Sequence, residues 1–252
     1  CELRTVQRLA VHIFGAAMRI AVVNFSGSVG KTVVTSHLLA PRIPQAEIIA
    51  VESTNESAAD LGLDVDQLRG AQFGKLFRKL LTASAAIVDV GASNIEDFLA
   101  ELNKYDQSQA EIDYFILPVV PSGKAQRETI KTIESLSGSG VTPDRIRVLF
   151  NRVDVNSIDE FSPIFAYAKL SRAFMANPQA QIFESDVFDL LANRRLTIEA
   201  IVADQTDYRA QLGETDPDNE DEIERISDLI ALQSLARPVH RQLNQTFNAL
   251  FA

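Results

Sequence analysis

Apolar and polar positions divide the chain into short apolar runs separated by amphipathic stretches. Runs of the kind that form buried strands occur at residues 20–23, 46–51, 85–91, 114–120, 147–151 and 180–183. Apolar residues at helical spacing predict helices at residues 31–39, 72–81, 95–102, 122–136, 158–174 and 187–192. Strands that alternate with helices predict an α/β fold, with a mostly parallel sheet and helices on both faces.

The last part of the chain departs from this alternation. Residues 214–224 contain seven acidic residues and no basic residue, so we expect an acidic, solvated loop at residues 213–224. Apolar spacing across residues 225–252 predicts an amphipathic helix with a kink near Pro238. The apolar face of this helix either closes a flank of the sheet, which we prefer, or presents a surface to another chain.

The first residues of the chain raise a separate question. Arg4 and Arg8 precede a short apolar run, as in a secretory signal, but His12 interrupts that run. Because the first strand follows Met18 almost directly, we expect translation to begin there and residues 1–17 to be an upstream extension. The main domain would then span residues 18–212.

Composition narrows the class of protein. Hydrophobic residues make up 46% of the chain and charged residues 23%, as in soluble globular proteins. A formal net charge of −10 argues against non-specific attraction of the whole surface to nucleic acid. The single cysteine, Cys1, excludes an internal disulfide, and no apolar run approaches the ~20 residues of a membrane span. We therefore expect a cytoplasmic protein without a transmembrane segment.

A loop rich in glycine and serine joins the first predicted strand to the first helix. Its glycines allow backbone N–H groups to approach a phosphate, and Lys31 places a positive charge beside it. The Thr32 hydroxyl is suited to Mg²⁺, and the dipole of the following helix favours the same anion. An ordinary Gly/Ser turn is the alternative, but strand, loop and helix follow in the order that a phosphate-binding loop needs. The nucleotide-binding residues expected in this loop are Ser26, Gly27, Ser28, Val29, Gly30, Lys31 and Thr32.

A carboxylate stands near the end of the third predicted strand. Asp89 follows four apolar residues, and an unpaired carboxylate costs several kcal/mol to bury. Such a residue is tolerated where it is paired or linked to a metal ion. Asp89 is therefore a candidate site residue.

Together these residues resemble the ParA/MinD-type ATPases, whose phosphate loop usually reads K-G-G-V-G-K-T. The loop at residues 26–32 is similar to it, Asp89 resembles the acid that holds Mg²⁺ with Thr32, and Asn151 resembles an asparagine that contacts the base. The resemblance covers about residues 18–212. Segments that are further similar to the plasmid-stability StbB and conjugal-transfer TraL proteins lie at residues 24–32, 38–42, 88–98 and 117–121.

This resemblance implies a P-loop NTPase fold of the SIMIBI type, with ATP and Mg²⁺ as cofactors. It also implies a nucleotide-dependent switch that acts in plasmid stability, plasmid partition or conjugal transfer. The family further implies a homodimer, and a partner that is a DNA-binding adapter protein or another partition or conjugation component. Direct DNA binding is not favoured, because the net charge is negative.

Two departures from the family bear on catalysis. The family's signature lysine, which reaches the nucleotide of the partner subunit, corresponds to Ser26, and Lys124 is a candidate to replace its charge. The family's second acid, which positions the attacking water, corresponds to Thr54. Acids that could take its part are Glu52, Glu56 and Asp60. We name Lys31, Asp89 and Glu52 as candidate catalytic residues and expect weak hydrolysis. A nucleotide-binding scaffold without turnover is the alternative.

The segment at residues 151–154 leaves the choice of base open. It reads N-R-V-D and resembles the N-K-x-D of related GTPases, in which a carboxylate at the position of Asp154 accepts hydrogen bonds from guanine. Arg152 departs from the lysine of that motif, and the segment also suits ATP-binding members, so we favour ATP over GTP. A metabolic synthetase with the same loop is a weaker hypothesis, because no motif for a second substrate is visible.

Overall fold

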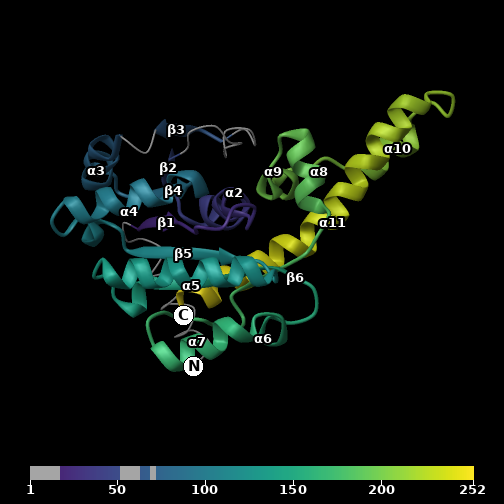
Figure 1. Ribbon diagram of the computed structural model, residues 1–252. Helices are drawn as coiled ribbons and strands as arrows, with labels where there is room; N and C mark the ends of the chain where they lie inside the picture. Colours follow the sequence, from purple (N-terminus) through teal and green to yellow (C-terminus); the bar gives the residue numbers. More distant parts are fainter. Residues whose placement is uncertain (1–17, 52–62, 69–71) are drawn as a thin grey trace, which may run out of the picture.

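Figure 1 shows the computed structural model, which describes residues 18–51, 63–68 and 72–252. The described residues form a seven-stranded sheet in the order β3-β2-β4-β1-β5-β6-β7, in which every neighbouring pair is parallel. The strands are β1 (Arg19–Val22), β2 (Glu47–Val51), β3 (Val65–Leu68), β4 (Ala86–Val90), β5 (Tyr114–Val119), β6 (Ile146–Val153) and β7 (Gln181–Phe183). The predicted α/β fold with a parallel sheet is confirmed.

Helices cover both faces of this sheet. The α-helices are α2 (Lys31–Val33), α3 (Phe73–Thr82), α4 (Ile95–Lys104), α5 (Gly123–Gly138), α6 (Ser157–Glu160), α7 (Ser162–Ser171), α8 (Val187–Arg194), α9 (Ile198–Ala203), α10 (Tyr208–Glu214) and α11 (Glu220–Phe251). A π-helix, η1 (Val34–Leu39), continues α2. Short 3₁₀ helices lie at Ala40–Arg42, Ala92–Asn94, Ser108–Glu111 and Pro143–Arg145.

The central strand β1 is buried on both faces, because its side chains alternate between two apolar cores. Ala21 belongs to a core that α3, α4, α5 and α7 cover, whereas Ile20 and Val22 belong to the core beneath η1, α8, α9 and α11. Both strand neighbours of β1, β4 and β5, come later in the chain. The loop after β1 therefore leaves the sheet between two packed layers, at its carboxyl edge.

Several elements differ from the sequence-based expectation, and each has a physical reason. β3 lacks an apolar run, because Asp66 and Gln67 are exposed at the edge of the sheet. The helix expected at residues 158–174 is two helices, α6 and α7, and Pro163 occupies the first turn of α7. The unpredicted helices α9 and α10 are short and begin at polar caps.

The acidic segment before the last helix is shorter than the predicted loop at residues 213–224. α11 begins at Glu220, because the Asn219 side chain caps it by accepting the Glu222 N–H, at 3.3 Å. Acidic residues in the first turn of a helix are also favoured by its dipole. Pro238 lies inside α11, and the helix continues through it without a break.

The C-terminal half of α11 closes one flank of the sheet, as preferred from the sequence. Leu243 and Phe247 are buried in the core beneath this helix, and Arg42 donates to Asn244 Oδ1 at 2.8 Å. The first half of α11 extends away from the sheet with α10 beside it (Figure 1). Within the described ranges, no helix is both long enough and apolar enough to cross a membrane.

Candidate functional site

The loop between β1 and α2 folds tightly around its last glycine. Gly30 has φ +85°, and a Cβ atom at this position would lie 2.3 Å from Asn151 Nδ2. Ser28 also has a positive φ of 57°. Glycine is therefore required at residue 30, both for its backbone conformation and for the close approach of Asn151. α2 and the π-helix η1 follow at once, and π-helical turns are frequent at functional sites.

The side chain of Lys31 points toward the start of this loop. Its side chain is buried, and its Nζ donates to the carbonyl oxygens of Ser26, at 3.0 Å, and Asn24, at 3.5 Å. The Ser26 N–H donates to Asn24 Oδ1 at 2.9 Å, so this amide is already satisfied within the protein. The loop amides that remain to face a phosphate therefore begin at Gly27.

Asp89 lies in β4 beside the loop, opposite Val22 in the register of the sheet. Its side chain is buried, and this burial raises its pKa to about 6 against the opposing influence of the Lys31 charge. The hydroxyls of Thr32 and Thr35 also lower this pKa, but their geometry does not amount to a hydrogen bond. Neither carboxylate oxygen of Asp89 has a hydrogen-bond partner among the described residues. Such an orphaned buried carboxylate fits a cation.

Asn151 reaches the loop from β6. Its side chain is buried, and its Nδ2 donates to the Val29 carbonyl oxygen at 2.9 Å. The sequence predicts that Asn151 and Asp154 both contact the nucleotide, and the two residues differ in burial. Asp154 is exposed beyond the strand, where its backbone N–H donates to Glu160 at 3.0 Å. Asn151 therefore braces the loop with the nitrogen of its amide.

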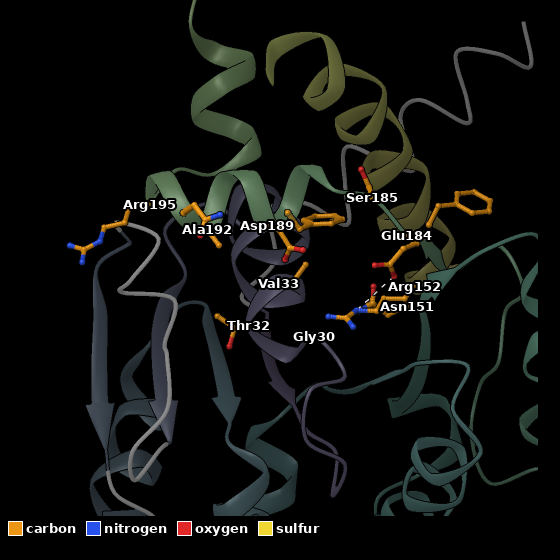
Figure 2. A pocket seen from close by; sticks show the side chains of 13 residues that line it. Gly30, Thr32, Val33, Asn151, Arg152, Glu184, Ser185, Asp189, Ala192 and Arg195 are labelled. Carbon is orange, nitrogen blue, oxygen red and sulfur yellow. Dashed lines mark ion pairs between the residues drawn. The ribbon is translucent and has the colours of Figure 1, made fainter. Parts of the chain in front are cut away.

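A cavity of about 770 Å³ opens beside the loop. Figure 2 shows Thr32, Val33 and Gly30 below it and α8 above it. Arg152, which has φ 54°, and Glu184 form an ion pair at one end of the cavity, with 3.8 Å between Arg152 Nε and Glu184 Oε2. The sequence did not identify the lining residues from β7 onward, which include Glu184, Ser185, Asp189 and Arg195. The sequence feature that could have identified them is their position after a predicted strand, at the edge where parallel sheets bind ligands.

Other predicted residues lie elsewhere. Glu52, with the alternatives Glu56 and Asp60, lies outside the described residues, as does Thr54. Lys124 is exposed in the first turn of α5 and pairs with Glu128 at 3.7 Å, and it does not line the cavity.

Comparison with solved structures identifies the fold of the chain. Cyanothece McdA, as an ATP complex of a variant, has a TM-score of 0.50 and 17% identity, over 86% of this chain and 98% of that chain. MinD from Pyrococcus horikoshii, complexed with Mg-ADP, has a TM-score of 0.51 and 14% identity, over 84% and 93%. MinD from Pyrococcus furiosus, a cell division ATPase, has a TM-score of 0.50 and 13% identity, over 86% and 98%. No protein-family model and no curated protein matches the sequence. At these identities the likeness establishes the P-loop NTPase fold alone.

Proposed function

We propose that this chain is a ParA/MinD-type ATPase that binds Mg²⁺ and ATP at the loop between β1 and α2. One observation carries the proposal: Asp89, a buried carboxylate without a hydrogen-bond partner among the described residues, lies beside the loop that holds Lys31 and Thr32. A phosphate loop binds the phosphates of a nucleotide, and a Mg²⁺ ion bound with them would neutralise the buried negative charge of Asp89. The structural neighbours that bind ATP or Mg-ADP support this proposal.

Each residue of the site has a part in this proposal. The backbone N–H groups from Gly27 to Gly30 cradle the phosphates, and Lys31 places its charge on the β- and γ-phosphates. Thr32 and Asp89 hold Mg²⁺, directly or through water, and the cation neutralises charge on the triphosphate. Asn151 holds the loop in place, and the adjoining cavity of about 770 Å³ receives the ribose and base.

Nucleotide titrations test the binding proposal. Wild type is expected to bind Mg-ATP, and Lys31→Ala and Asp89→Asn are expected to bind it much more weakly. Absence of Mg-ATP binding by the folded wild-type protein would refute the proposal. Parallel titrations with Mg-GTP test the choice of base, and a clear preference for GTP would overturn our choice of ATP.

Turnover is a separate part of the proposal. Ser26 and Thr54 stand where the family has a lysine and an acid, so we expect slow hydrolysis, with Glu52 as the candidate acid. A phosphate-release assay compares wild type with Lys31→Ala. If wild type releases phosphate and Lys31→Ala does not, the result supports an ATPase. Mg-ATP binding without release supports the scaffold instead.

The biological role follows from the motif resemblance. We propose that the chain acts as a switch in plasmid stability, plasmid partition or conjugal transfer, as a homodimer with a DNA-binding adapter or another partition or conjugation component. Replacing the native gene by the Lys31→Ala allele is expected to reduce plasmid retention or transfer. Unchanged retention and transfer with a null allele would refute this role. Light scattering with and without Mg-ATP tests the dimer.

A further inference from the structure

A fully buried asparagine joins the phosphate loop to the rest of the domain. Asn24 stands between β1 and the loop, and its side-chain amide faces three different segments. Its Nδ2 donates to the Pro118 carbonyl oxygen, at 2.9 Å, and to Thr129 Oγ1, at 2.7 Å. Its Oδ1 accepts the Ser26 N–H at 2.9 Å. One carboxamide thus ties the start of the loop to β5 and α5.

A second threonine of α5 holds the next residue of the loop. Phe25 N–H donates to Thr132 Oγ1 at 3.1 Å, and the ammonium of Lys131 lies 4.4 Å from the centre of the Phe25 ring. Thr129 and Thr132 are one turn apart on the buried face of α5, and both are fully inaccessible to solvent. Two successive residues of the loop are therefore attached to a single helix.

Both threonine hydroxyls of this cluster donate within α5, and the Thr132 hydroxyl also lies 3.4 Å from a second acceptor, Asn24 Oδ1. The Thr129 hydroxyl donates to the Ala125 carbonyl oxygen, and the Thr132 hydroxyl donates to that of Glu128, each at 2.8 Å. Each hydroxyl has one hydrogen, so its oxygen remains only as an acceptor. Asn24 Nδ2 and the Phe25 N–H meet these acceptors. A residue without a donor at position 24 would leave the Thr129 oxygen unmatched in a dry interior.

This cluster also holds two of the groups that contact Lys31. The two carbonyl oxygens that accept from Lys31 Nζ belong to Asn24 and Ser26, and both residues are held by the Asn24 amide. A shift of the loop start would therefore move the groups that hold Lys31. Lys31 can reach a phosphate at the right place only while this backbone stays in place.

We propose that Asn24, Thr129 and Thr132 form a positioning unit that holds the phosphate loop and Lys31 in the shape that binds nucleotide. This inference rests on the proposed function, because it concerns the same loop. Pure support of the fold is the competing explanation. The two differ in one respect: a positioning unit changes nucleotide affinity in the folded protein, and pure support changes only stability.

Isosteric threonine substitutions separate these explanations. Thr129→Val and Thr132→Val keep the shape of the side chain and remove the hydroxyl. Each is expected to weaken Mg-ATP binding roughly 3- to 10-fold, which corresponds to one lost hydrogen bond. Thr129→Ser keeps the hydroxyl, so this variant is expected to bind Mg-ATP with the affinity of wild type. Asn24→Ala removes several contacts at once and endangers the fold, so the threonine variants are the primary test.

Thr246→Val is the matched control. Thr246 is equally buried, and its hydroxyl donates to the carbonyl oxygens of Gln181, at 2.5 Å, or Gln242, at 3.1 Å, far along the chain in α11. Its substitution is expected to lower stability, measured by chemical denaturation without nucleotide, and to leave the dissociation constant for Mg-ATP unchanged. Unchanged affinity in both Thr129→Val and Thr132→Val, with only stability lowered, would overturn the positioning unit.

The same titrations distinguish this failure from a failure of the proposed function. If folded wild type does not bind Mg-ATP, the proposed function fails and this inference fails with it. If wild type binds, Lys31→Ala does not, and both threonine variants bind like wild type, only the positioning unit is refuted.

Discussion

Gly30 is the loop residue with the least freedom to change. Its positive φ is strained for any other residue, and a Cβ would collide with Asn151 Nδ2. We predict that Gly30→Ala lowers the free energy of unfolding by about 1–3 kcal/mol and weakens Mg-ATP binding, because Asn151 would be displaced from Val29. Chemical denaturation and nucleotide titration measure the two effects.

Gly213→Ala provides the control for that substitution. Gly213 lies in α10, and a Cβ there would have no heavy atom within 4 Å. Because glycine is a poor helix former, this change is expected to raise the free energy of unfolding by up to about 0.5–1 kcal/mol, with no effect on nucleotide. If the two variants behave alike, the tight contact at Gly30 is not real.

Asp89 lowers the stability of the folded protein but is needed for the proposed binding of Mg²⁺. Burial disfavours its charged form, and its pKa of about 6 means that the carboxylate is still mostly ionised at pH 7. We predict that Asp89→Asn raises the free energy of unfolding of the nucleotide-free protein by about 1–3 kcal/mol, because a neutral amide replaces a buried charge. The same variant should lose most of the Mg²⁺-dependence of nucleotide binding, which titration with and without EDTA measures. A destabilised Asp89→Asn protein would contradict the first part.

His37 gives stability a pH dependence of known sign. It is buried, its Nδ1 accepts the Ile198 N–H at 3.3 Å, and burial lowers its pKa to about 4. Between pH 6.5 and 4 the unfolded chain takes up a proton that the folded chain does not, so stability falls as pH falls. The loss amounts to up to about 3 kcal/mol. In denaturation series across this range, His37→Gln should lose less stability than wild type, and equal losses would contradict the assignment.

At the scale of elements, one face of α11 packs into the core that lies beneath η1, α8, α9 and α11. Leu243 is fully buried in this helix, whereas Leu235 of the same helix is 44% exposed. We predict that Leu243→Ala lowers the free energy of unfolding by about 2–5 kcal/mol, because it removes apolar contacts and leaves a cavity. Leu235→Ala should change it by less than about 0.5 kcal/mol. Denaturation of both variants compares two faces of one helix.

Periodicity predicted the strands that carry continuous apolar runs and missed β3, which has none. β1, β4 and β5 carry runs such as Ile20 to Val22, which a sequence pattern reveals. β3 is held by strand pairing to β2, and its Asp66 ion pair with Lys79 lies on the exposed edge. The backbone supplies that stability, so no apolar run signals the strand.

At the scale of the whole molecule, the sequence located one half of the candidate site. Residues adjacent in the chain, such as Lys31 and Thr32, were identified by their motif, and Asp89 by the cost of burying it. The wall that α8 forms over the cavity depends on how the chain returns after β7, which local patterns do not encode. Asp154 lies in a bend after β6 and is exposed, and the local sequence pattern does not encode that bend.

The contact between Asn151 and Val29 spans 122 positions of the chain, and it has a consequence for biosynthesis. The phosphate loop is translated early, but β4, β5 and β6, which flank and brace it, emerge from the ribosome much later. A nascent chain that ends before β6 carries the complete loop motif without the brace. If the proposed function holds, nucleotide would stabilise a chain only after its synthesis has passed β6.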